Sequence, residues 1–218
     1  MAQPRVVSVQ IGAVRELGTV GAAKRMDRPW SSAIFKEPVS GRRFATALGL
    51  DGDEQANTVD HGGPDKALLA YSDENRATWA DLLGEVPPGG FGENLTISGL
   101  DETTVCIGDR FRIGDALVEC SQPRQPCWKL DNRWRQRDLS TRVVETGRSG
   151  WYLRVLEPGE IGAGDDVELT EHPNPEWSVA RAARIMHRLE RDARVAAQLA
   201  ALPELSATWR ETLLARAR

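Results

Sequence analysis

Cysteine and histidine are scarce in this chain, which limits the metal centres and disulfides that it can form. Its 218 residues include three cysteines and three histidines. The cysteines are Cys106, Cys120 and Cys127, and no C-x-x-C spacing occurs, so neither a zinc ribbon nor a thioredoxin-type motif is indicated. So small and odd a set argues against a disulfide-stapled secreted protein and favours a reducing, cytoplasmic location.

Long apolar runs are missing as well. The first residues, Met1 to Arg5, contain no apolar signal core and lead directly into a run typical of a strand. No stretch approaches the roughly 18 consecutive apolar residues that a membrane-spanning helix needs. We therefore expect no membrane contact, and a chain of one large domain or of one domain with a small appendage.

A large excess of charge of one sign is also absent, since the net charge is −4, but the charges are unevenly distributed. Residues 121–148 contain seven Lys or Arg and only three Asp or Glu. A basic segment in an otherwise acidic chain favours a local anionic ligand over general nucleic-acid binding. A solvated loop and helix face is the alternative interpretation.

Short apolar runs separated by glycine and proline dominate the first 170 or so residues. They predict strands at 6–11, 33–36, 44–48, 67–71, 95–97, 105–113, 116–120, 151–156 and 167–169. Gly114-Asp115 predicts a hairpin, Ser72 is a candidate N-cap for a helix over 73–83, and 128–146 is expected to be helical in part. This pattern predicts a mainly β fold with inserted helices, as a barrel or folded sheet, rather than a doubly wound α/β fold.

The composition changes after His172-Pro173-Asn174-Pro175. Runs rich in Ala, Leu and Arg predict three helices over 178–188, 191–202 and 206–217. We therefore expect one domain at 1–173 and a small three-helix domain at 174–218. The alternating charges of these helices favour a solvated or partner-facing surface over a DNA-reading helix-turn-helix.

The most informative stretch is Ser121–Leu130. Pro123 and Pro126 exclude a helix interior there and favour a stiff loop. Cys127 stands in it between Arg124 and Lys129, and nearby positive charge lowers the pKa of a thiol and favours the thiolate. A thiolate can act as a nucleophile, a redox centre or a soft-metal ligand. The alternative is a buried structural cysteine, which is the role we expect for Cys106 and Cys120.

A second informative stretch is His61-Gly62-Gly63-Pro64-Asp65-Lys66. Its two glycines allow backbone amides to approach a ligand and form an anion-binding nest, to which His61 and Lys66 add side-chain donors. The Walker spacing is absent, so this is not a nucleotide P-loop. A Gly-Gly-Pro turn with one polar histidine is the alternative.

Two further polar residues are ligand candidates. Lys36 follows a predicted strand, and Asn94 offers both a donor and an acceptor. A solvated lysine and a turn asparagine are the alternatives. The acidic stretch Gly49–Gln55 does not fit the EF-hand pattern, so calcium is not expected.

Six of these segments, in this order, resemble the motifs of the MOSC-domain proteins, which are named for the C-terminal domain of molybdenum cofactor sulfurases. They are Ser32–Val39, Gly49–Gln55, His61–Ala67, Phe91–Thr96, Ile107–Asp109 and Gln122–Leu130. The chain is most similar to the YiiM-like subfamily, whose short three-helix domain the tail resembles.

The resemblance implies a β-barrel-like MOSC fold that binds the molybdenum cofactor (molybdopterin). It implies that Cys127, which matches the family's cysteine, is the molybdenum ligand and the catalytic residue. The other candidates match family motifs, and their assignment to the pterin and its phosphate is our own interpretation: Lys36, His61, Gly62, Gly63, Lys66, Asn94, Arg124 and Lys129.

The resemblance also implies an activity, the reduction of N-hydroxylated compounds such as hydroxylaminopurine-type bases and hydroxylamines, as a detoxification. The chain has no flavin, haem or iron–sulfur motif and pyridoxal phosphate is not required, so an external flavoprotein or iron–sulfur reductase is expected to supply electrons. The three-helix tail would then dock that reductase or pair two protomers as a homodimer.

Three alternatives stay open: a non-catalytic carrier of the cofactor, a persulfide carrier using Cys127, and a DNA-associated regulator acting through the tail. Specific nucleic-acid binding is not expected.

Overall fold

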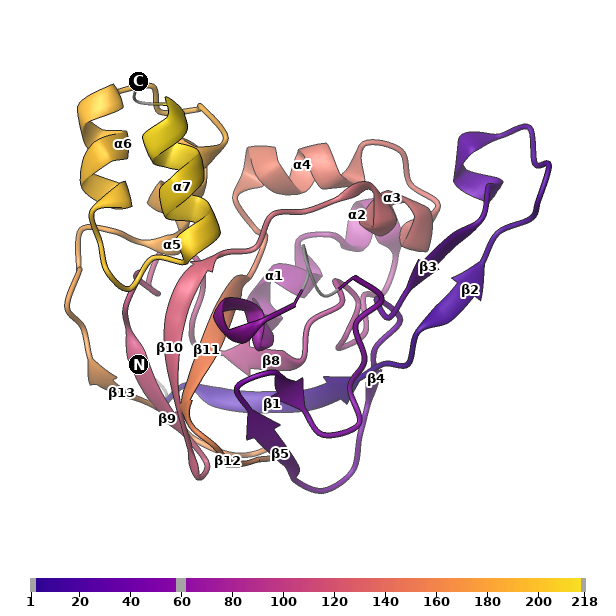
Figure 1. The fold of residues 1–218 in the computed structure, drawn as a ribbon. Coiled ribbons are helices and arrows are strands. Elements are labelled where there is room, and N and C mark those ends of the chain that lie inside the picture. The colour runs from indigo at the N-terminus through magenta and orange to yellow at the C-terminus, as the bar shows by residue number, and fades with distance from the viewer. Residues whose placement is uncertain (1–2, 58–61, 217–218) are drawn as a thin grey trace.

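The centre of the molecule is a large mixed sheet. The computed structural model describes residues 3–57 and 62–216. The strands of this sheet are β1 (Arg5–Ile11), β4 (Glu37–Pro38), β7 (Leu68–Ser72), β8 (Leu95–Ser98), β9 (Arg110–Ile113), β10 (Ala116–Pro123), β11 (Trp151–Glu157) and β13 (Val167–Glu171). Their spatial order is β13-β9-β10-β11-β7-β8-β1-β4 (Figure 1). Every neighbouring pair is antiparallel except β7 and β8, which run parallel.

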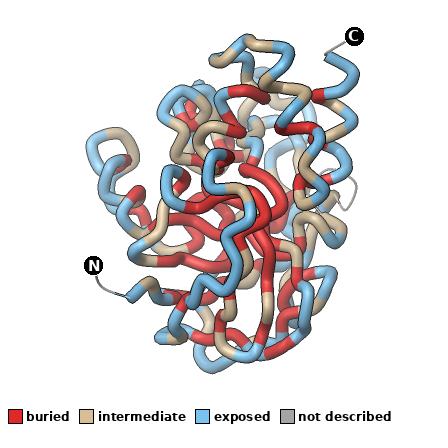
Figure 2. Tube along the Cα trace, turned by 90° about the vertical axis from the view of Figure 1, so that its left-hand side faces the viewer, coloured by how far each residue is buried: buried red, intermediate tan, exposed pale blue. Residues whose placement is uncertain are grey.

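The sheet curls back on itself. A backbone bridge joins Arg5 of β1 to Asp166, directly before β13, and the Val6 amide donates to the Asp165 carbonyl at 2.9 Å. β13 ends the strand order and β1 is next to its other end, so these contacts close the sheet into a barrel-like shape. Its interior is filled with apolar side chains, and the buried part of the trace runs through the middle of the molecule (Figure 2).

Two small sheets extend this framework. One has the order β12 (Gly159–Ile161), β5 (Arg43–Thr46) and β6 (Gly49–Leu50). The other is an arm of β2 (Arg15–Leu17) and β3 (Trp30–Ser32), which projects from the body and carries the short helix η1 (Arg25–Asp27) near its tip (Figure 1). The sequence analysis did not predict this arm.

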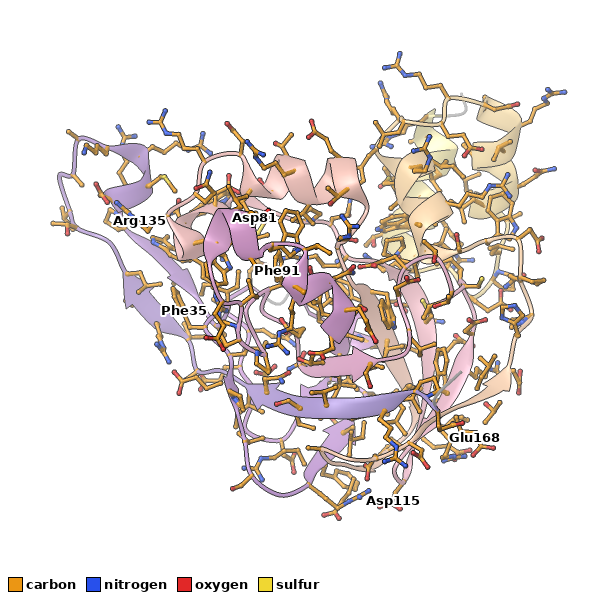
Figure 3. The ribbon with its side chains drawn as sticks, turned by 180° about the vertical axis from the view of Figure 1, so that it is seen from behind. Phe35, Asp81, Phe91, Asp115, Arg135 and Glu168 are labelled. Carbon is orange, nitrogen blue, oxygen red and sulfur yellow. The ribbon has the colours of Figure 1, made fainter. Side chains whose placement is uncertain are left out.

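Four short helices surround one end of the sheet. They are α1 (Asp73–Ala77), α2 (Ala80–Leu83), α3 (Trp128–Trp134) and α4 (Leu139–Thr146). Their apolar residues form a second cluster with Tyr71 and Phe91, whose rings stack at 4.6 Å. Figure 3 shows Phe91 from behind, close to the short helices. Arg135 at the end of α3 is ion-paired with Asp27 at 2.6 Å, which ties the arm to this cluster.

The chain ends in α5 (Val179–Met186), α6 (Ala193–Ala200) and α7 (Ala207–Arg216). The prediction of a mainly β fold with inserted helices and three C-terminal helices is therefore confirmed. Trp177, Leu205 and Trp209 belong to the same apolar cluster as the sheet interior, so the tail packs on the sheet. The domain boundary at residue 173 stays a prediction. In the described part of the chain, no helix has the length and apolar character needed to cross a membrane.

Two predicted elements are wrong. The strand at 33–36 does not form, because β3 ends at Ser32 and the Ile34 carbonyl accepts a hydrogen bond from the Arg133 side chain. The helix over 73–83 is broken after Ala77, and Trp79 at the break is buried with its indole donating to the Tyr71 hydroxyl at 2.8 Å. In both cases tertiary contacts override the local pattern.

Two other predictions were wrong at their boundaries. β9 begins only at Arg110, because the Asp109 carboxylate accepts from the Cys106 amide at 2.8 Å and closes a turn over 106–109. The stiff loop predicted from Ser121 begins only after Pro123, which ends β10. The neighbouring strand β9 pairs with β10 only as far as Glu119, so one side of β10 has no partner strand at Pro123. Proline lacks a backbone N–H, and at this position no hydrogen bond to a neighbouring strand is lost on that side.

Candidate functional site

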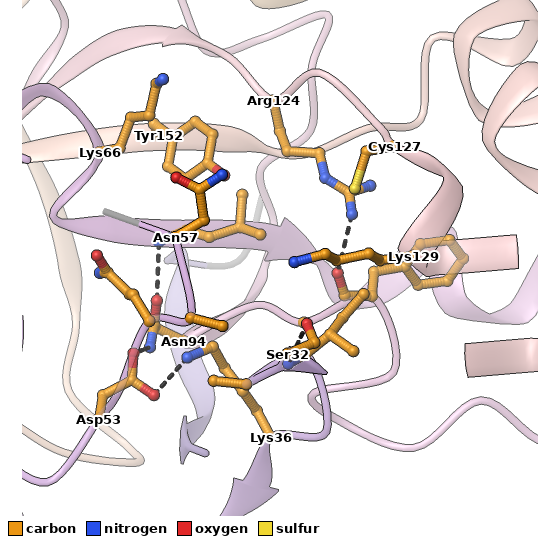
Figure 4. Close-up of a pocket in the computed structure, with 17 residues that line it drawn as sticks. Ser32, Lys36, Asp53, Asn57, Lys66, Asn94, Arg124, Cys127, Lys129 and Tyr152 are labelled. Atoms are coloured by element: carbon orange, nitrogen blue, oxygen red, sulfur yellow. Dashed lines mark hydrogen bonds and ion pairs between the residues drawn. The ribbon is translucent and has the colours of Figure 1, made fainter. Parts of the chain in front are cut away.

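One pocket contains most of the residues that the sequence analysis selected. Its cavity volume is about 90 Å³, and the pocket opens to solvent at its mouth. It is lined by Ser32, Ala33, Ile34, Lys36, Asp53, Gln55, Ala56, Asn57, Lys66, Leu69, Phe91, Gly92, Asn94, Arg124, Cys127, Lys129 and Tyr152 (Figure 4). Six predicted site residues thus meet in one place although they come from four separate segments of the chain.

Gly62 and Gly63 do not line this pocket. They line a neighbouring hollow with Lys66 and Thr208, so Lys66 borders both spaces. Gly63 has a φ of +88°, a left-handed conformation that favours glycine, and a Cβ atom there would meet no neighbour within 4 Å. His61, which was also predicted as a cofactor ligand, lies outside the described residues.

Lys36, Asp53 and Asn94 form what we name the bonded wall of the pocket. The Asp53 carboxylate is ion-paired with the Lys36 ammonium, and it accepts hydrogen bonds from the Gly12 amide at 2.8 Å and from Asn94 Nδ2 at 2.9 Å. Asn94 also accepts from the Leu69 amide at 3.1 Å through its Oδ1. These groups bond mainly to each other and to the backbone, so they hold the shape of the pocket.

The charged side chains of the bonded wall are also almost inaccessible to solvent. The side chains of Lys36 and Asp53 are only 8% and 2% exposed. Burial lowers the pKa of Lys36, while the charge of Asp53 and its hydrogen bond act in the opposite direction. The Lys36 charge is therefore compensated within the protein, which makes this lysine less available to an anion than the sequence analysis expected.

Arg124, Cys127 and Lys129 form what we name the open wall. Arg124 is only 5% exposed, and its Nη2 donates to the Phe91 carbonyl at 3.4 Å. Its Nη1 is buried and has no hydrogen-bond partner among residues 3–57 and 62–216. In the same ranges the Lys129 side chain has no ion pair or hydrogen bond. A buried guanidinium with an unmet donor is the feature expected of a binding site for an anion.

Cys127 follows Pro126 in the short connection from β10 to α3 and is partly exposed. Cys106 and Cys120 are buried, as predicted. Burial raises the pKa of Cys106 to about 11, and it raises the pKa of Cys120 well above the usual range. Of the three thiols, Cys127 is the one placed in a pocket with access to a ligand (Figure 4).

The sequence analysis missed two residues of the pocket. Asp53 lies in the acidic stretch Gly49–Gln55, but its partners are far away in the sequence, so no local signal showed its role. Tyr152 lies on β11, where Trp151 and Leu153 on either side point into the core, and this alternation was a usable signal. Burial raises the pKa of Tyr152, so its hydroxyl stays protonated and can donate a hydrogen bond.

Comparisons with known proteins agree with this architecture. The MOSC domain matches residues 57–168, and the YiiM-like, 3-alpha helix domain matches residues 177–216. Protein YiiM of Escherichia coli is 40% identical over 190 residues, which cover 85% of this chain and 84% of that protein. The crystal structure of YiiM from Geobacillus stearothermophilus superposes with a TM-score of 0.82 at 34% identity, covering 99% of this chain and 100% of that one.

A third relative is longer. A protein named reductase from Gibberella moniliformis is 37% identical over 181 residues, which cover 79% of this chain but only 32% of that protein. On these matches, the chain belongs to the MOSC-domain proteins and, within them, to the YiiM-like proteins that carry a three-helix C-terminal domain.

Proposed function

We propose that this chain binds the molybdenum cofactor in the described pocket and reduces N-hydroxylated compounds to amines with electrons from an external reductase. The observation that carries the proposal is the open wall, where an accessible thiol lies with the side chain of Lys129 and with a buried guanidinium whose Nη1 has no partner in the described part of the chain. MOSC domains are associated with molybdenum cofactor binding, and the name of the fungal relative supports a reductase.

The donor set fits the cofactor. Cys127 offers a sulfur ligand to the metal, since thiolates bind soft metal ions. Arg124, Lys129 and Lys66 offer positive charge to the pterin phosphate, and Gly62 and Gly63 adjoin Lys66 in the neighbouring hollow. The bonded wall gives the pterin ring a fixed surface, with the second lone pair of Asn94 Oδ1 left to accept a hydrogen bond.

When bound, the cofactor supplies two-electron oxygen-atom transfer at a metal, which no side chain can perform. The net reaction is R–NHOH plus two electrons and two protons to give R–NH₂ and water. Protons must therefore reach the departing oxygen. The Tyr152 hydroxyl, which stays protonated, is the candidate donor in the pocket, because Lys129 is assigned to the phosphate and the Lys36 ammonium is held by Asp53.

The test compares the wild-type chain with Cys127→Ala after expression in a host that makes the cofactor. We expect near-stoichiometric molybdenum in the wild type, turnover of a hydroxylamine with reduced viologen as electron donor, and loss of both in Cys127→Ala. Cys120→Ala removes a buried thiol outside the pocket and should keep both. Full activity in Cys127→Ala would contradict the proposal. Bound cofactor without turnover of any hydroxylamine would favour a non-catalytic cofactor carrier instead.

A further inference from the structure

We propose that Cys106, Asp109 and His172 form a zinc site where the barrel-like sheet meets the three-helix tail. None of these residues lines the pocket, and the proposed reduction does not use them. Among the described residues they are the one group of His, Cys, Asp or Glu whose ligand atoms come together in this way. The Cys106 sulfur, one ring nitrogen of His172 and a carboxylate oxygen of Asp109 all lie within 4.8 Å of one another.

The chemistry of the three side chains matches zinc. Zn²⁺ is bound in proteins by cysteine sulfur, histidine nitrogen and carboxylate oxygen, with four ligands in a tetrahedron. A Cys106 thiolate and an Asp109 carboxylate together carry two negative charges, which would neutralise the ion. Glu176 adds further negative charge close to Cys106. Binding would release the Cys106 proton to solvent, because the thiolate is the ligand.

The surroundings already orient the ligands. Asp109 uses Oδ2 to accept the Cys106 amide at 2.8 Å, which fixes the carboxylate and leaves Oδ1 towards His172. His172 Nδ1 and Asp109 Oδ1 are 2.6 Å apart, so a small separation of these two groups makes room for an ion between them. Ligating carboxylates in metal sites are commonly held by such a second hydrogen bond.

The site is reachable from solvent on one side only. The Asp109 side chain is 2% exposed and Cys106 is buried, whereas the His172 side chain is 40% exposed. Zinc can therefore enter past His172, and a water molecule can occupy the fourth position on that side. None of the three ligands lines the pocket of the candidate site, and we assign the ion a structural role.

That role follows from the segments that the ligands join. Cys106 and Asp109 belong to the turn before β9, and His172 begins the linker to the tail. The same segments are already in contact, since Asn174 Nδ2 donates to the Ile107 carbonyl at 3.0 Å and Cys106 forms a backbone bridge with Ser178. A bound ion would fix the start of the tail to the sheet and stabilise the folded chain.

Cobalt is the probe for the experiment, because Co²⁺ takes the place of zinc and absorbs in the near ultraviolet when sulfur is a ligand. The full-length chain carries Cys127→Ala throughout, so that the pocket thiol cannot give the same signal. We expect one Co²⁺ per chain with a sulfur-to-cobalt absorption band, which one equivalent of Zn²⁺ abolishes. Cys106→Ser should remove the band, and His172→Ala should weaken Zn²⁺ binding by about 100-fold or more.

His187→Gln, which changes the histidine directly after α5 instead, is the matched control and should keep the band and the affinity. His172→Ala alters a partly exposed side chain, so it tests the site even where Cys106→Ser fails to fold. Absence of the band in the Cys127→Ala chain would overturn the proposal. So would a band that persists in Cys106→Ser, or Zn²⁺ affinity unchanged in His172→Ala.

Discussion

The two walls of the pocket contain similar polar residues but differ in how these are satisfied. In the bonded wall, the Lys36 charge and the Asn94 amide bond to Asp53 and to the backbone. In the open wall, Arg124 is equally buried, yet its Nη1 has no partner among the described residues. A buried polar group that bonds within the protein holds the fold, whereas an unmet buried donor indicates a ligand.

The comparison predicts opposite results for substitutions in the two walls. Changes in the bonded wall should lower the stability of the chain, since they leave buried groups without partners. Changes in the open wall should leave stability almost intact and lower the cofactor content.

The largest loss of stability is expected for Asp53→Ala. This substitution leaves the Lys36 ammonium buried without its counter-ion and removes the acceptor of the Gly12 amide. Breaking a buried ion pair in this way costs about 3–5 kcal/mol in the free energy of unfolding, which urea denaturation measures. Asp51→Ala, on an exposed neighbour, should stay within about 0.5 kcal/mol of the wild type. Equal effects of the two variants would remove the distinction between the walls.

Asn94→Ala should have the next largest effect. The Leu69 amide loses its acceptor, and the Asp53 carboxylate loses one donor. The cost of leaving such buried groups unmet is about 2 kcal/mol, again measured by urea denaturation. A neutral result would show that water replaces the amide, and Asn94 would then have to be counted with the open wall.

A smaller effect concerns pH. Burial lowers the pKa of Lys36 in the folded chain below its ordinary value of 10.5, which applies to the unfolded chain. At pH values between these two pKa values, the unfolded chain therefore binds more protons than the folded chain. Stability contributed through Lys36 must therefore rise with pH in that window. Urea denaturation at a series of pH values measures the free energy of unfolding of both chains. The value for the wild type should rise relative to the value for Lys36→Met as the pH rises towards 10.5. Lys24→Met, on the exposed arm, should show no such change relative to the wild type.

Local signals in the sequence were sufficient for part of the fold. The hairpin at Gly114-Asp115 is observed, because its turn and its two strands are adjacent in the chain. The three C-terminal helices could likewise be predicted, because their composition and their capping residues are local signals. The barrel-like closure through Arg5 and Asp166 depends on residues far apart in the chain, so the strand pattern left a barrel and a folded sheet as alternatives, and the family resemblance favoured the barrel.

The candidate site shows the same limit. Arg124, Cys127 and Lys129 lie close together in the sequence, so their shared charge and chemistry could be predicted. The pairing of Lys36 with Asp53 spans separate loops, and the sequence pattern therefore left Lys36 as an isolated cation. The predicted strand at 33–36 failed for a related reason, since Arg133 binds the Ile34 carbonyl from a distant helix.

The most direct test of the difference between the walls is the pterin content of Arg124→Gln, measured by the fluorescence of the oxidised pterin and compared with urea stability on the same preparation. We predict that Arg124→Gln loses most of the bound pterin while its free energy of unfolding stays within about 1 kcal/mol of the wild type. Nη1 has no partner among the described residues, and the side-chain hydrogen bond that the guanidinium loses is the long one from Nη2 to the Phe91 carbonyl. Wild-type pterin content in Arg124→Gln, or a loss of stability as large as that of Asp53→Ala, would contradict the account.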